Sequence, residues 1–526
     1  MREPKRNSES LLSGDRSTLV PRRAFLALAG AGTAAVLGGR LAPGSDGAEI
    51  GRSRSAQAAG GPHLSSSRGG TVAGGVQSFR SRPDLRPPQV TIDVPVRTSL
   101  DGLVITECHA GLAQQGPLII DQEGQVVWFA PLSPQPTIGA RAFNVRVQSY
   151  QGKPALTWFE GSVVDGHGRG HYVICDQTYR HVRRIAAQRG LQGDLHAFLL
   201  TPRGTALFTC YARATGHVRV GRLVRSVPYW YGVVQEVDLA SGRLLWSWRS
   251  DRHVGLSESY VPPNVRQGPA WDYFHINSIS IDPADQNLVI SGRNTWAAYK
   301  VDRRSGRVLW RLGGKHSDFR MGPGSGFAFQ HDVEMRDDGV VTVFDNEGGP
   351  PQVAPQSRAL VLLVDQQRRR VWLRRAIEHQ PPVYSDALGN VQPLGDGRIF
   401  VGWGRSSFFT QYGPHGGVEF DGHLSAGISS YRAFLQPWSA TPARPPDLTL
   451  TRSASSATLY ASWNGATGVE SWVVLGGPTA TALQPLGTAT VGGFETAITV
   501  PAAPVCLAVS AYSANGVQLG TSAVLS

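Results

Sequence analysis

Four polar residues in the segment 275–294 have the types and spacing to form one chemical site. In the extended sequence His275-Ile276-Asn277, strand alternation places the two polar side chains on one face. Arg293 and Asn294 end the next apolar run, LVISGRN. Because the two ends of an antiparallel hairpin return to each other, we expect His275, Asn277 and Arg293 to cluster.

Two more histidines occupy equivalent positions in a repeated strand pattern. Each copy begins with a polar residue, continues through apolar positions and ends at a turn. The copies are FNVRVQSYQG, LHAFLLTPRG, INSISIDPAD, QHDVEMRDDG and GNVQPLGDG, which in register present Asn144, His196, Asn277, His331 and Asn390. If these strands are structurally equivalent, His196 and His331 join the cluster around His275.

This combination of side chains favours the binding of an anionic tetrahedral group. An Arg fork with His and Asn donors suits sulfate or phosphate, and a neutral imidazole is also a nucleophile near neutral pH. Glycoside hydrolysis is disfavoured because it needs two carboxyl groups. Three histidines are enough for zinc, but His196, His275 and His331 lack short ligand spacings, so we expect no metal. Taken singly, each histidine could instead tie strands together.

The elements that must position these residues are short strands in a repeat of about 47 to 64 residues. An outer pattern of apolar residues, an Asp, a turn and apolar residues recurs as LIIDQEGQVVW, VICDQTYRHVRRI, QEVDLASGRLLW, YKVDRRSGRVLW and LLVDQQRRRVW, with a degenerate sixth copy in TQYGPHGGVEF. We therefore predict a six-bladed β-propeller over residues 93–442. The inner strands of its blades line the axial channel, so their polar residues converge. The first repeat lacks a clean inner strand.

The recurring tryptophans of the outer pattern are expected to pack within the blades; they are Trp128, Trp246, Trp310 and Trp372. The composition agrees with many short strands and turns, since the 526 residues include 62 Gly, 35 Pro and 13 Trp.

The segments that flank the repeats have other patterns. Residues 447–526 follow the proline-marked sequence ARPPDL and alternate as short strands, with Trp463 and Tyr512 placed as in a small C-terminal fibronectin type III-like β-sandwich. The whole fold is thus predicted to be all-β. Residues 60–92 are rich in Gly, Ser, Arg and Pro, and we expect a flexible linker there.

Residues 1–59 are interpreted as a twin-arginine signal and leader. Arg22-Arg23 is followed by Phe25 and a Gly/Ala-rich apolar stretch. The stretch is too short and too weakly apolar to span a bilayer stably, although a membrane anchor is the alternative. Cleavage is expected after Ala58 or earlier. We expect a secreted or cell-envelope protein that meets the membrane only during export.

Charge and cysteine content limit the possible partners. The formal net charge is +12, but the longest basic run is Arg368-Arg369-Arg370. A nucleic-acid-binding protein would need a clustered basic face, so we expect no nucleic acid partner. Cys175 and Cys210 lie in adjacent repeats, and they either form a disulfide or stay as buried thiols.

The blade pattern together with FHIN, SGRN and FQHDVEM resembles the bacterial and fungal arylsulfotransferase family over roughly residues 95–440. The resemblance implies an exported six-bladed propeller without a cofactor. Such enzymes move a sulfuryl group from a phenolic sulfate ester to a phenol acceptor, independently of the nucleotide donor PAPS. The chain also lacks a Gly-rich phosphate loop for such a nucleotide.

The resemblance also implies roles for individual residues. His331 matches the nucleophile that takes the sulfuryl group as sulfohistidine, and His196 matches a further site histidine that binds an oxygen or protonates the leaving phenolate. His275, Asn277 and Arg293 match the residues that hold the sulfuryl oxygens. Two further asparagines are expected to contact substrate, namely Asn294 and Asn390.

Some features depart from the family pattern. The chain shows no separate N-terminal β-domain, and it adds the C-terminal sandwich, which suggests a divergent branch. Asp332 and His316 are extra polar residues without an assigned role.

Two other functions fit parts of the sequence. One is a non-catalytic secreted propeller that binds anionic or envelope ligands, with the C-terminal domain contacting the cell envelope. The other is a quinoprotein dehydrogenase, which would need a calcium site, and the sequence offers no convincing carboxylate cluster for that metal.

Overall fold

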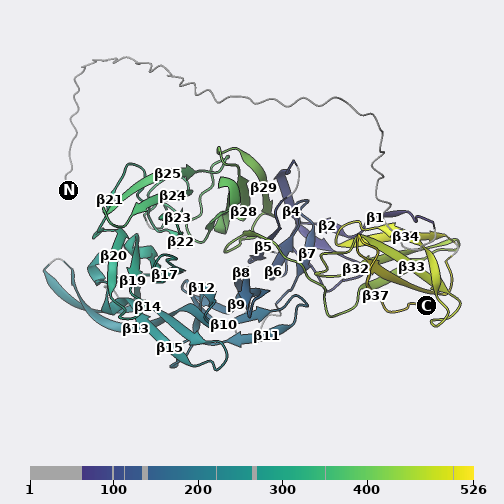
Figure 1. Cartoon of the computed structure of the whole chain (residues 1–526), viewed down its shortest axis with the longest axis horizontal. Coiled ribbons are helices and arrows are strands. Elements are labelled where there is room, and N and C mark those ends of the chain that lie inside the picture. Colours follow the sequence, from purple (N-terminus) through teal and green to yellow (C-terminus); the bar gives the residue numbers. More distant parts are fainter. Residues whose placement is uncertain are drawn as a thin grey trace, which may run out of the picture. The chain divides into compact units, whose positions relative to one another are not determined.

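The computed structural model describes residues 62–97, 100–111, 113–132, 140–220, 222–263, 269–349, 351–501 and 503–526, which lie in one compact unit. Strands make up almost all of its regular structure (Figure 1). The described part of the chain contains no α-helix, only short 3-10 turns: η1 (Ser250–Arg252), η2 (Leu256–Glu258), η3 (Arg293–Thr295), η4 (Gly395–Gly397) and η5 (Gly404–Ser406). The prediction of an all-β fold is confirmed.

Between residues 90 and 436, the described strands form five sheets, the largest of which has nine strands. This sheet divides at the single pairing of β10 with β12, Gly170 opposite Gly193, so that six antiparallel ladders built on four strands each can be followed along the chain. The first three are β30 (Phe434–Gln436), β5 (Leu103–Cys108), β6 (Gly116–Ile120) and β7 (Val126–Phe129); β8 (Arg141–Tyr150), β9 (Lys153–Val164), β10 (His167–Cys175) and β11 (His181–Ile185); and β12 (Gly193–Thr201), β13 (Thr205–Val220), β14 (Leu223–Asp238) and β15 (Leu244–Arg249), with β16 (Trp271–Asp272) beside β14.

The other three ladders follow in sequence order. They are β17 (Ile276–Ile281), β18 (Leu288–Gly292), β19 (Ala297–Val301) and β20 (Val308–Gly313); β22 (His331–Met335), β23 (Val340–Asp345), β24 (Arg358–Asp365) and β25 (Arg370–Ile377), with β21 (Arg320–Met321) beside β25; and β26 (Asn390–Pro393), β27 (Ile399–Gly402), β28 (Phe408–Tyr412) and β29 (Val418–Leu424), with β4 (Val90–Val94) at the edge.

Inner strands of adjacent ladders contact one another. Contacts run from β30 and β5 to β8, and then to β12, β17, β22 and β26 in turn. Of these strands, β8, β12, β17 and β22 lie toward the middle of Figure 1. The late strand β30 pairs with the early strand β5, Phe434 opposite Ile105. This pairing supplies the inner strand that the first repeat lacks in the sequence. The ladder order fits the predicted ring, whereas the six-bladed propeller stays a prediction.

The repeated Asp of the outer pattern forms the turn between the two outer strands. In each turn one carboxylate oxygen accepts a backbone N–H that follows within four residues, as Asn and Asp do in Asx turns. The turns are those of Asp121, Asp176, Asp238, Asp302 and Asp365. The recurrence of Asp is therefore explained by local turn chemistry.

Not all of the recurring tryptophans pack as expected. Trp128 and Trp310 are buried in hydrophobic clusters, and Trp246 is partly buried against one. Trp372 is 43% exposed on β25, opposite Leu363, which is also exposed. The packing prediction is wrong for Trp372, because its side chain lies on the solvent face of β25.

The C-terminal residues form two four-stranded sheets. One contains β31 (Asp447–Arg452), β32 (Ser456–Ser462), β35 (Glu495–Pro501) and β1 (Ser66–Arg68), and the other contains β34 (Gln484–Thr490), β33 (Ser471–Gly477), β36 (Cys506–Tyr512) and β37 (Gln518–Thr521). Trp463 and Trp472 lie in their shared core, while Tyr512 is half-buried.

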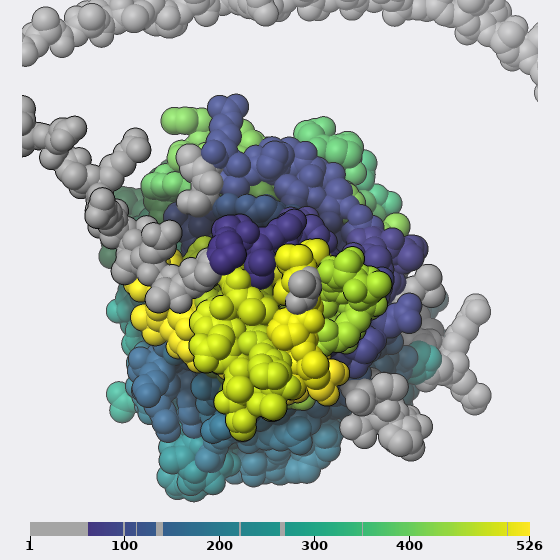
Figure 2. All heavy atoms as spheres, turned by 90° about the vertical axis from the view of Figure 1, so that its right-hand side faces the viewer, coloured from purple at the N-terminus to yellow at the C-terminus, as the bar shows by residue number. Residues whose placement is uncertain are grey.

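Residues 62–92 differ from the flexible linker expected for 60–92. They contain β1, the hairpin of β2 (Thr71–Ala73) and β3 (Val76–Ser78), and the first residues of β4. β1 pairs with β35, and β4 pairs with β29. Figure 2 shows these early residues in purple against the yellow-green C-terminal sheets. Edge pairing with distant strands, which composition does not indicate, orders this segment.

The structure shows the state of the four cysteines but does not describe the export segment. Cys108, Cys175, Cys210 and Cys506 are all free and buried, so Cys175 and Cys210 form no disulfide in this structure. The twin-arginine segment lies outside the described residues. Among the residues that are described, no helix has the length and apolar character needed to cross a membrane.

Candidate functional site

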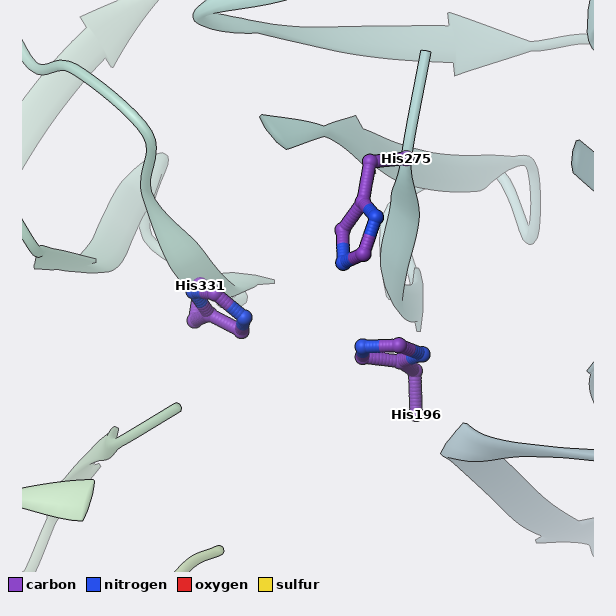
Figure 3. Close-up of side chains that lie close together, drawn as sticks. All are labelled: His196, His275 and His331. Carbon is purple, nitrogen blue, oxygen red and sulfur yellow. The ribbon is translucent and has the colours of Figure 1, made fainter. Parts of the chain in front are cut away.

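His196, His275 and His331 converge at the starts of three inner strands. His196 lies on β12, His275 immediately precedes β17, and His331 begins β22. One ring nitrogen of each lies within 4.8 Å of the others, and Figure 3 shows the three rings facing a common space. The predicted convergence of these three histidines is therefore observed.

Local backbone irregularities direct these side chains. The ladder register shifts at Phe143/Arg146, Gly193/Phe198, Ile276/Ser278 and His331/Glu334, so these four inner strands are bulged near their polar residues. His275 also has φ 53°, in the left-handed region that a non-glycine residue seldom adopts. Bulges next to active sites commonly re-aim side chains, and here they turn the imidazoles inward.

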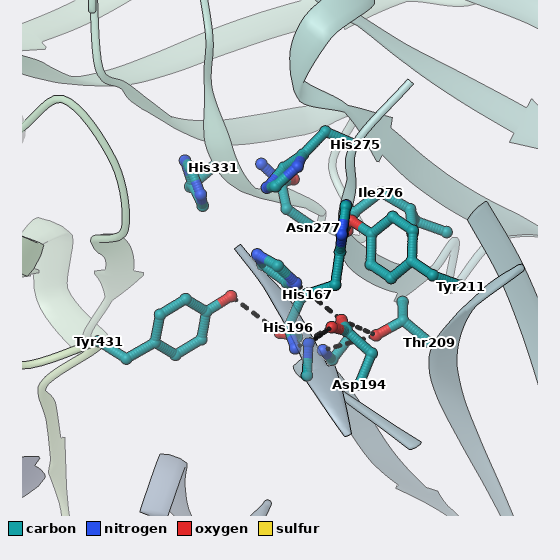
Figure 4. Close-up of polar contacts among 12 residues, drawn as sticks. His167, Asp194, His196, Thr209, Tyr211, His275, Ile276, Asn277, His331 and Tyr431 are labelled. Carbon is teal, nitrogen blue, oxygen red and sulfur yellow. Dashed lines mark hydrogen bonds and ion pairs between the residues drawn. The ribbon is translucent and has the colours of Figure 1, made fainter. Parts of the chain in front are cut away.

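His196 is held by a buried carboxylate. Its Nδ1 lies 2.7 Å from Oδ2 of Asp194, which also accepts the hydroxyl of Thr209 (Figure 4). Asp194 Oδ1 accepts the backbone N–H of Gly168. These hydrogen bonds and the adjacent His196 keep the pKa of Asp194 below its usual range despite burial. His196 therefore directs Nε2 toward the shared space.

His275 has the same arrangement with a different carboxylate. Its Nδ1 lies 2.5 Å from Oδ2 of Asp272, which also contacts Nε2 of His167 at 2.9 Å. Burial lowers the pKa of His275 to about 4, even though Asp272 opposes this shift. The free site therefore holds His275 as a neutral imidazole near neutral pH.

His331 differs because its Nδ1 faces a neutral amide. Nδ1 lies 2.7 Å from Oδ1 of Asn346, whose Nδ2 donates to the carbonyls of Ser385 and Leu388. Since Asn346 is thereby oriented as an acceptor, Nδ1 of His331 carries the proton. The N–H of Leu388 approaches Nε2 at 3.3 Å, which agrees with a lone pair there. Burial and the cation of Arg293 hold the pKa of His331 well below its usual value.

Arg293 is fixed beside the three histidines. One terminal nitrogen donates to Oδ1 of Asn294, and the other donates to the carbonyls of Gly348 and Asp386. The guanidinium also lies over the ring of Phe329, 4.8 Å from its centroid. A cation held this way offers a preorganised charge for an oxyanion.

The three asparagines expected to bind substrate do not line the site cavity. Asn277 donates to the carbonyl of Gln330, Asn294 donates to the carbonyl of Asp272, and Asn390 exchanges two hydrogen bonds with the backbone of Ala433. The clustering predicted from strand alternation fails for Asn277 because the bulge at Ile276/Ser278 breaks the alternation. These amides connect neighbouring ladders.

The three histidines and Arg293 line a cavity of about 420 Å³. Apolar side chains form part of its wall, and additional polar residues from other ladders also line it. The lining residues that the sequence patterns did not indicate include His109, Arg141, Phe143, Asp386 and Arg405. The register reasoning selected only the polar residue of each inner strand, so it passed over Arg141 and Phe143 at the start of β8, while His109, Asp386 and Arg405 lie outside the strands.

Further residues that no sequence pattern marked contact the predicted site residues from outside the cavity. Asp194 and Asp272 precede their histidines by two and three positions, and because these spacings differ, no repeated pattern marks the two carboxylates. Arg432, next to β30, is buried and contacts Asn144, the carbonyl of Asn277 and Asp332. It belongs to the closing strand, which the repeat pattern did not identify.

The arrangement can bind and attack an anionic group. His331 offers an unprotonated ring nitrogen, and His196 and His275 each have a carboxylate behind the ring. Arg293 supplies a guanidinium in a fixed position. The same three histidine nitrogens could also ligate a metal, with carboxylates and an amide behind them as in known metal sites. Together, the all-β ladders and this buried centre define a class of protein in which three histidines and an arginine meet at the starts of converging strands.

Comparison with known families identifies the group within that class. The model of the arylsulfotransferase (ASST) family matches residues 146–424, which is more than half of the chain. The chain belongs to the arylsulfotransferase family. The matched range includes His196, His275, Arg293 and His331. A search of curated proteins finds no match.

Solved structures show only distant similarity. A Bacteroides caccae protein of unknown function is 12% identical, covering 63% of this chain and 98% of its own, with a TM-score of 0.39. Streptogramin B lyase is 7% identical, covering 78% and 98%, with a TM-score of 0.32. A Xanthomonas campestris gluconolactonase is 11% identical, covering 69% and 98%, with a TM-score of 0.31.

Proposed function

We propose that the protein transfers a sulfuryl group from a phenolic sulfate ester to a phenol acceptor, with sulfohistidine at His331 as the intermediate. The convergence of His196, His275 and His331 beside Arg293 carries this proposal. Membership of the arylsulfotransferase family supports small aryl sulfates and phenols as substrates. PAPS and other cofactors have no place in this reaction.

His331 is the best candidate for the nucleophile because of its tautomer. Asn346 fixes the proton on Nδ1, so the lone pair of Nε2 is available for attack. Nδ1 of His196 lies 2.7 Å from Asp194 and Nδ1 of His275 lies 2.5 Å from Asp272, so each of these rings has a carboxylate behind it in place of an amide. This difference divides the three similar side chains into one nucleophile and two groups that interact with negative charge.

In the first half-reaction, Nε2 of His331 forms a bond to sulfur while the bond from sulfur to the aryl oxygen breaks. The bonding electron pair leaves on the phenolate oxygen, which takes a proton from His196. Arg293 and protonated His275 hold the sulfuryl oxygens. Although His275 is neutral in the free site, the arriving anion favours its protonation.

The second half-reaction reverses these roles. The acceptor phenol gives its proton to His196, and its oxygen attacks sulfur. The bond from sulfur to Nε2 then breaks and returns the lone pair to His331. The net reaction exchanges one aryl sulfate and one phenol for another aryl sulfate and another phenol, without net proton release.

We extend the proposal to the architecture that positions this site. The ordered contacts among the inner strands and the pairing of β30 with β5 support a six-bladed propeller over 93–442. The paired four-stranded sheets support a fibronectin type III-like domain over 447–526. Arg22-Arg23 supports twin-arginine export to the cell envelope or medium, which replacement of both arginines by lysine would block.

Turnover and trapping experiments test the proposed reaction. With 4-nitrophenyl sulfate and phenol, we expect release of nitrophenol, and His331→Ala should lower kcat/KM by about 10³-fold or more. Without acceptor, intact-mass analysis should detect one added sulfuryl group on the wild type and none on His331→Ala. His196→Ala should still form the adduct from this good leaving group.

His217→Ala is the matched control, because His217 is exposed on β13 and distant in sequence from the site residues. It should retain wild-type turnover. Undiminished turnover by His331→Ala would contradict the proposal. Saturable binding of aryl sulfate with neither turnover nor adduct would instead support the alternative of a non-catalytic binding propeller.

A further inference from the structure

The side of the cavity formed by His109, Arg141 and Phe143 has polar groups that the proposed reaction does not use. His109 follows β5, while Arg141 and Phe143 lie two positions apart on β8. β5 and β8 are neighbouring strands of adjacent ladders. These residues therefore form one continuous wall of the cavity.

His109 is buried without hydrogen bonds to its ring. Its relative exposure is 4%, and neither ring nitrogen has a hydrogen-bond partner among the described residues. Its backbone exchanges two hydrogen bonds with Ser429, and its ring stacks on Phe143 with centroids 4.1 Å apart. Because leaving a buried polar group unpaired is costly, an imidazole fixed in this way indicates a missing partner.

The ring of His109 needs a ligand to complete its hydrogen bonding. Oε1 of Glu107 lies 3.6 Å from Nε2, too far for a hydrogen bond. Glu107 itself is occupied by the backbone N–H groups of Val145, Tyr431 and Arg432. The imidazole can therefore act as a donor to a ligand while Glu107 stays in place.

Arg141 adds a cation to the same wall. The described residues provide its guanidinium with no hydrogen bond or ion pair, and its side chain is exposed at the cavity. Of the other lining arginines, Arg405 has its Nε 3.0 Å from Asp386, the one carboxylate among the described lining residues. Arg293 is assigned to the sulfuryl group. Arg141 is left as an uncompensated charge.

This wall lies away from the proposed sulfuryl position. The ring of His109 contacts Phe143, the ring of Phe143 contacts Tyr431 at 6.0 Å, and Tyr431 contacts His196 at 5.9 Å between centroids. His109 has no described ring contact with the three central histidines. An aromatic substrate with its sulfate at His331 would lie along Phe143 and direct its far end toward His109 and Arg141.

We propose that this wall is a binding subsite for a carboxylate on the aromatic ring, so that the preferred substrates are aryl sulfates that carry a carboxylate away from the sulfate ester. Arg141 and His109 donate to the carboxylate oxygens, and Phe143 packs against the ring. The inference rests on the proposed function, since it assigns the other end of the cavity to the sulfuryl group.

The ratio of kcat/KM for two substrates, one charged and one uncharged, tests this subsite. 4-Carboxyphenyl sulfate and its uncharged isostere 4-carbamoylphenyl sulfate are compared by kcat/KM with phenol as acceptor. We expect the wild type to prefer the carboxylate, and Arg141→Gln to reduce that preference by about 10-fold. His109→Asn should reduce it in the same direction. Differences between the two leaving groups cancel because the ratio is compared across variants.

Arg203→Gln is the control, because Arg203 is exposed in the turn between β12 and β13 and does not line the cavity. It should leave the ratio unchanged. Turnover of both esters with the same ratio in wild type and Arg141→Gln would overturn the subsite while leaving the sulfuryl transfer intact.

If neither ester is turned over, calorimetric titration with the same two esters still tests the subsite independently of the transfer reaction. Tighter binding of the carboxylate by the wild type, lost in Arg141→Gln, would support the subsite although the transfer reaction failed. Equal binding of both esters by both proteins would overturn the subsite without reference to catalysis.

Discussion

At the scale of single residues, the group behind each histidine determines its chemistry. Asn346 keeps Nδ1 of His331 protonated and adds no negative charge, whereas Asp194 and Asp272 stand behind the other two imidazoles. Burial then disfavours the imidazolium at His331. The proposed nucleophile thus stays unprotonated beside Arg293.

Asn346→Asp should shift the acid limb of the pH profile of kcat/KM upward by roughly 1–3 pH units, because an adjacent carboxylate stabilises the imidazolium and raises the pKa of His331. Protonated His331 cannot attack, so activity falls as pH drops through the raised pKa and returns above it. The profile is measured with 4-nitrophenyl sulfate. Gln151→Glu, at an exposed position, should leave the limb unchanged, and an unshifted limb in Asn346→Asp would argue against His331 as nucleophile.

Binding of an aryl sulfate should be coupled to proton uptake by His275. Because its pKa is about 4 in the free site, His275 is neutral at pH 6, and a bound anion raises that pKa. Titration in buffers of different ionisation enthalpy should show uptake of up to one proton with the non-reacting variant His331→Ala. The uptake should disappear in the double variant with His275→Ala. Uptake that persists there would assign the proton to another group.

Sequence patterns predicted which histidines meet better than they predicted what each polar side chain contacts. The inner-strand repeat correctly brought His196 and His331 to His275, because equivalent strands start at equivalent places. The same reasoning misplaced Asn277 and Asn390, whose amides connect ladders. Side-chain direction depends on bulges and on a positive φ, and neither has a marker in a single sequence.

At the scale of elements, the short strand β30 links the end of the ladder series to its first ladder. It extends over Phe434–Gln436, pairs with β5, and follows Arg432, which reaches three other ladders or their ends. Three residues with no repeat motif cannot be recognised as a strand from periodicity. The outer strands were predictable because the Asp turn recurs, whereas β30 and β1 depend on long-range pairing.

Leu435→Pro should destabilise the protein by about 3 kcal/mol or more. The N–H of Leu435 donates to Oε1 of Gln392, and proline removes this donor from an inner strand. The free energy of unfolding is measured in urea. Leu245→Pro is the control, because Leu245 is 44% exposed on the edge strand β15, where proline is better tolerated. Equal effects of the two substitutions would show that β30 has no special role in closure.

At the scale of the whole molecule, the C-terminal sheets contact the first ladder through backbone-directed hydrogen bonds. The amide of Asn464 accepts the N–H of Phe129 and donates to its carbonyl, both at 2.9 Å. The N–H of Gly465 donates to the carbonyl of Val127, and Tyr179 donates to the carbonyl of Gly465. The bonds of Asn464 and Gly465 reach β7, and that of Tyr179 comes from the turn between β10 and β11, whereas the proposed site residues lie at the inner strands. We therefore expect the C-terminal sheets to contribute to stability and not to the proposed reaction.

Asn464→Ala should uncouple the unfolding of residues 447–526 from that of the ladders and leave kcat/KM for 4-nitrophenyl sulfate unchanged. Loss of the paired hydrogen bonds leaves the backbone groups of Phe129 without these partners and costs about 1–3 kcal/mol of contact free energy. Calorimetry of the full chain should then resolve two transitions where the wild type shows one. Gln518→Ala, on the far-edge strand β37, should keep a single transition. A single unshifted transition in Asn464→Ala would mean that the strand pairing of β1 with β35, and not the contact at β7, couples the sheets.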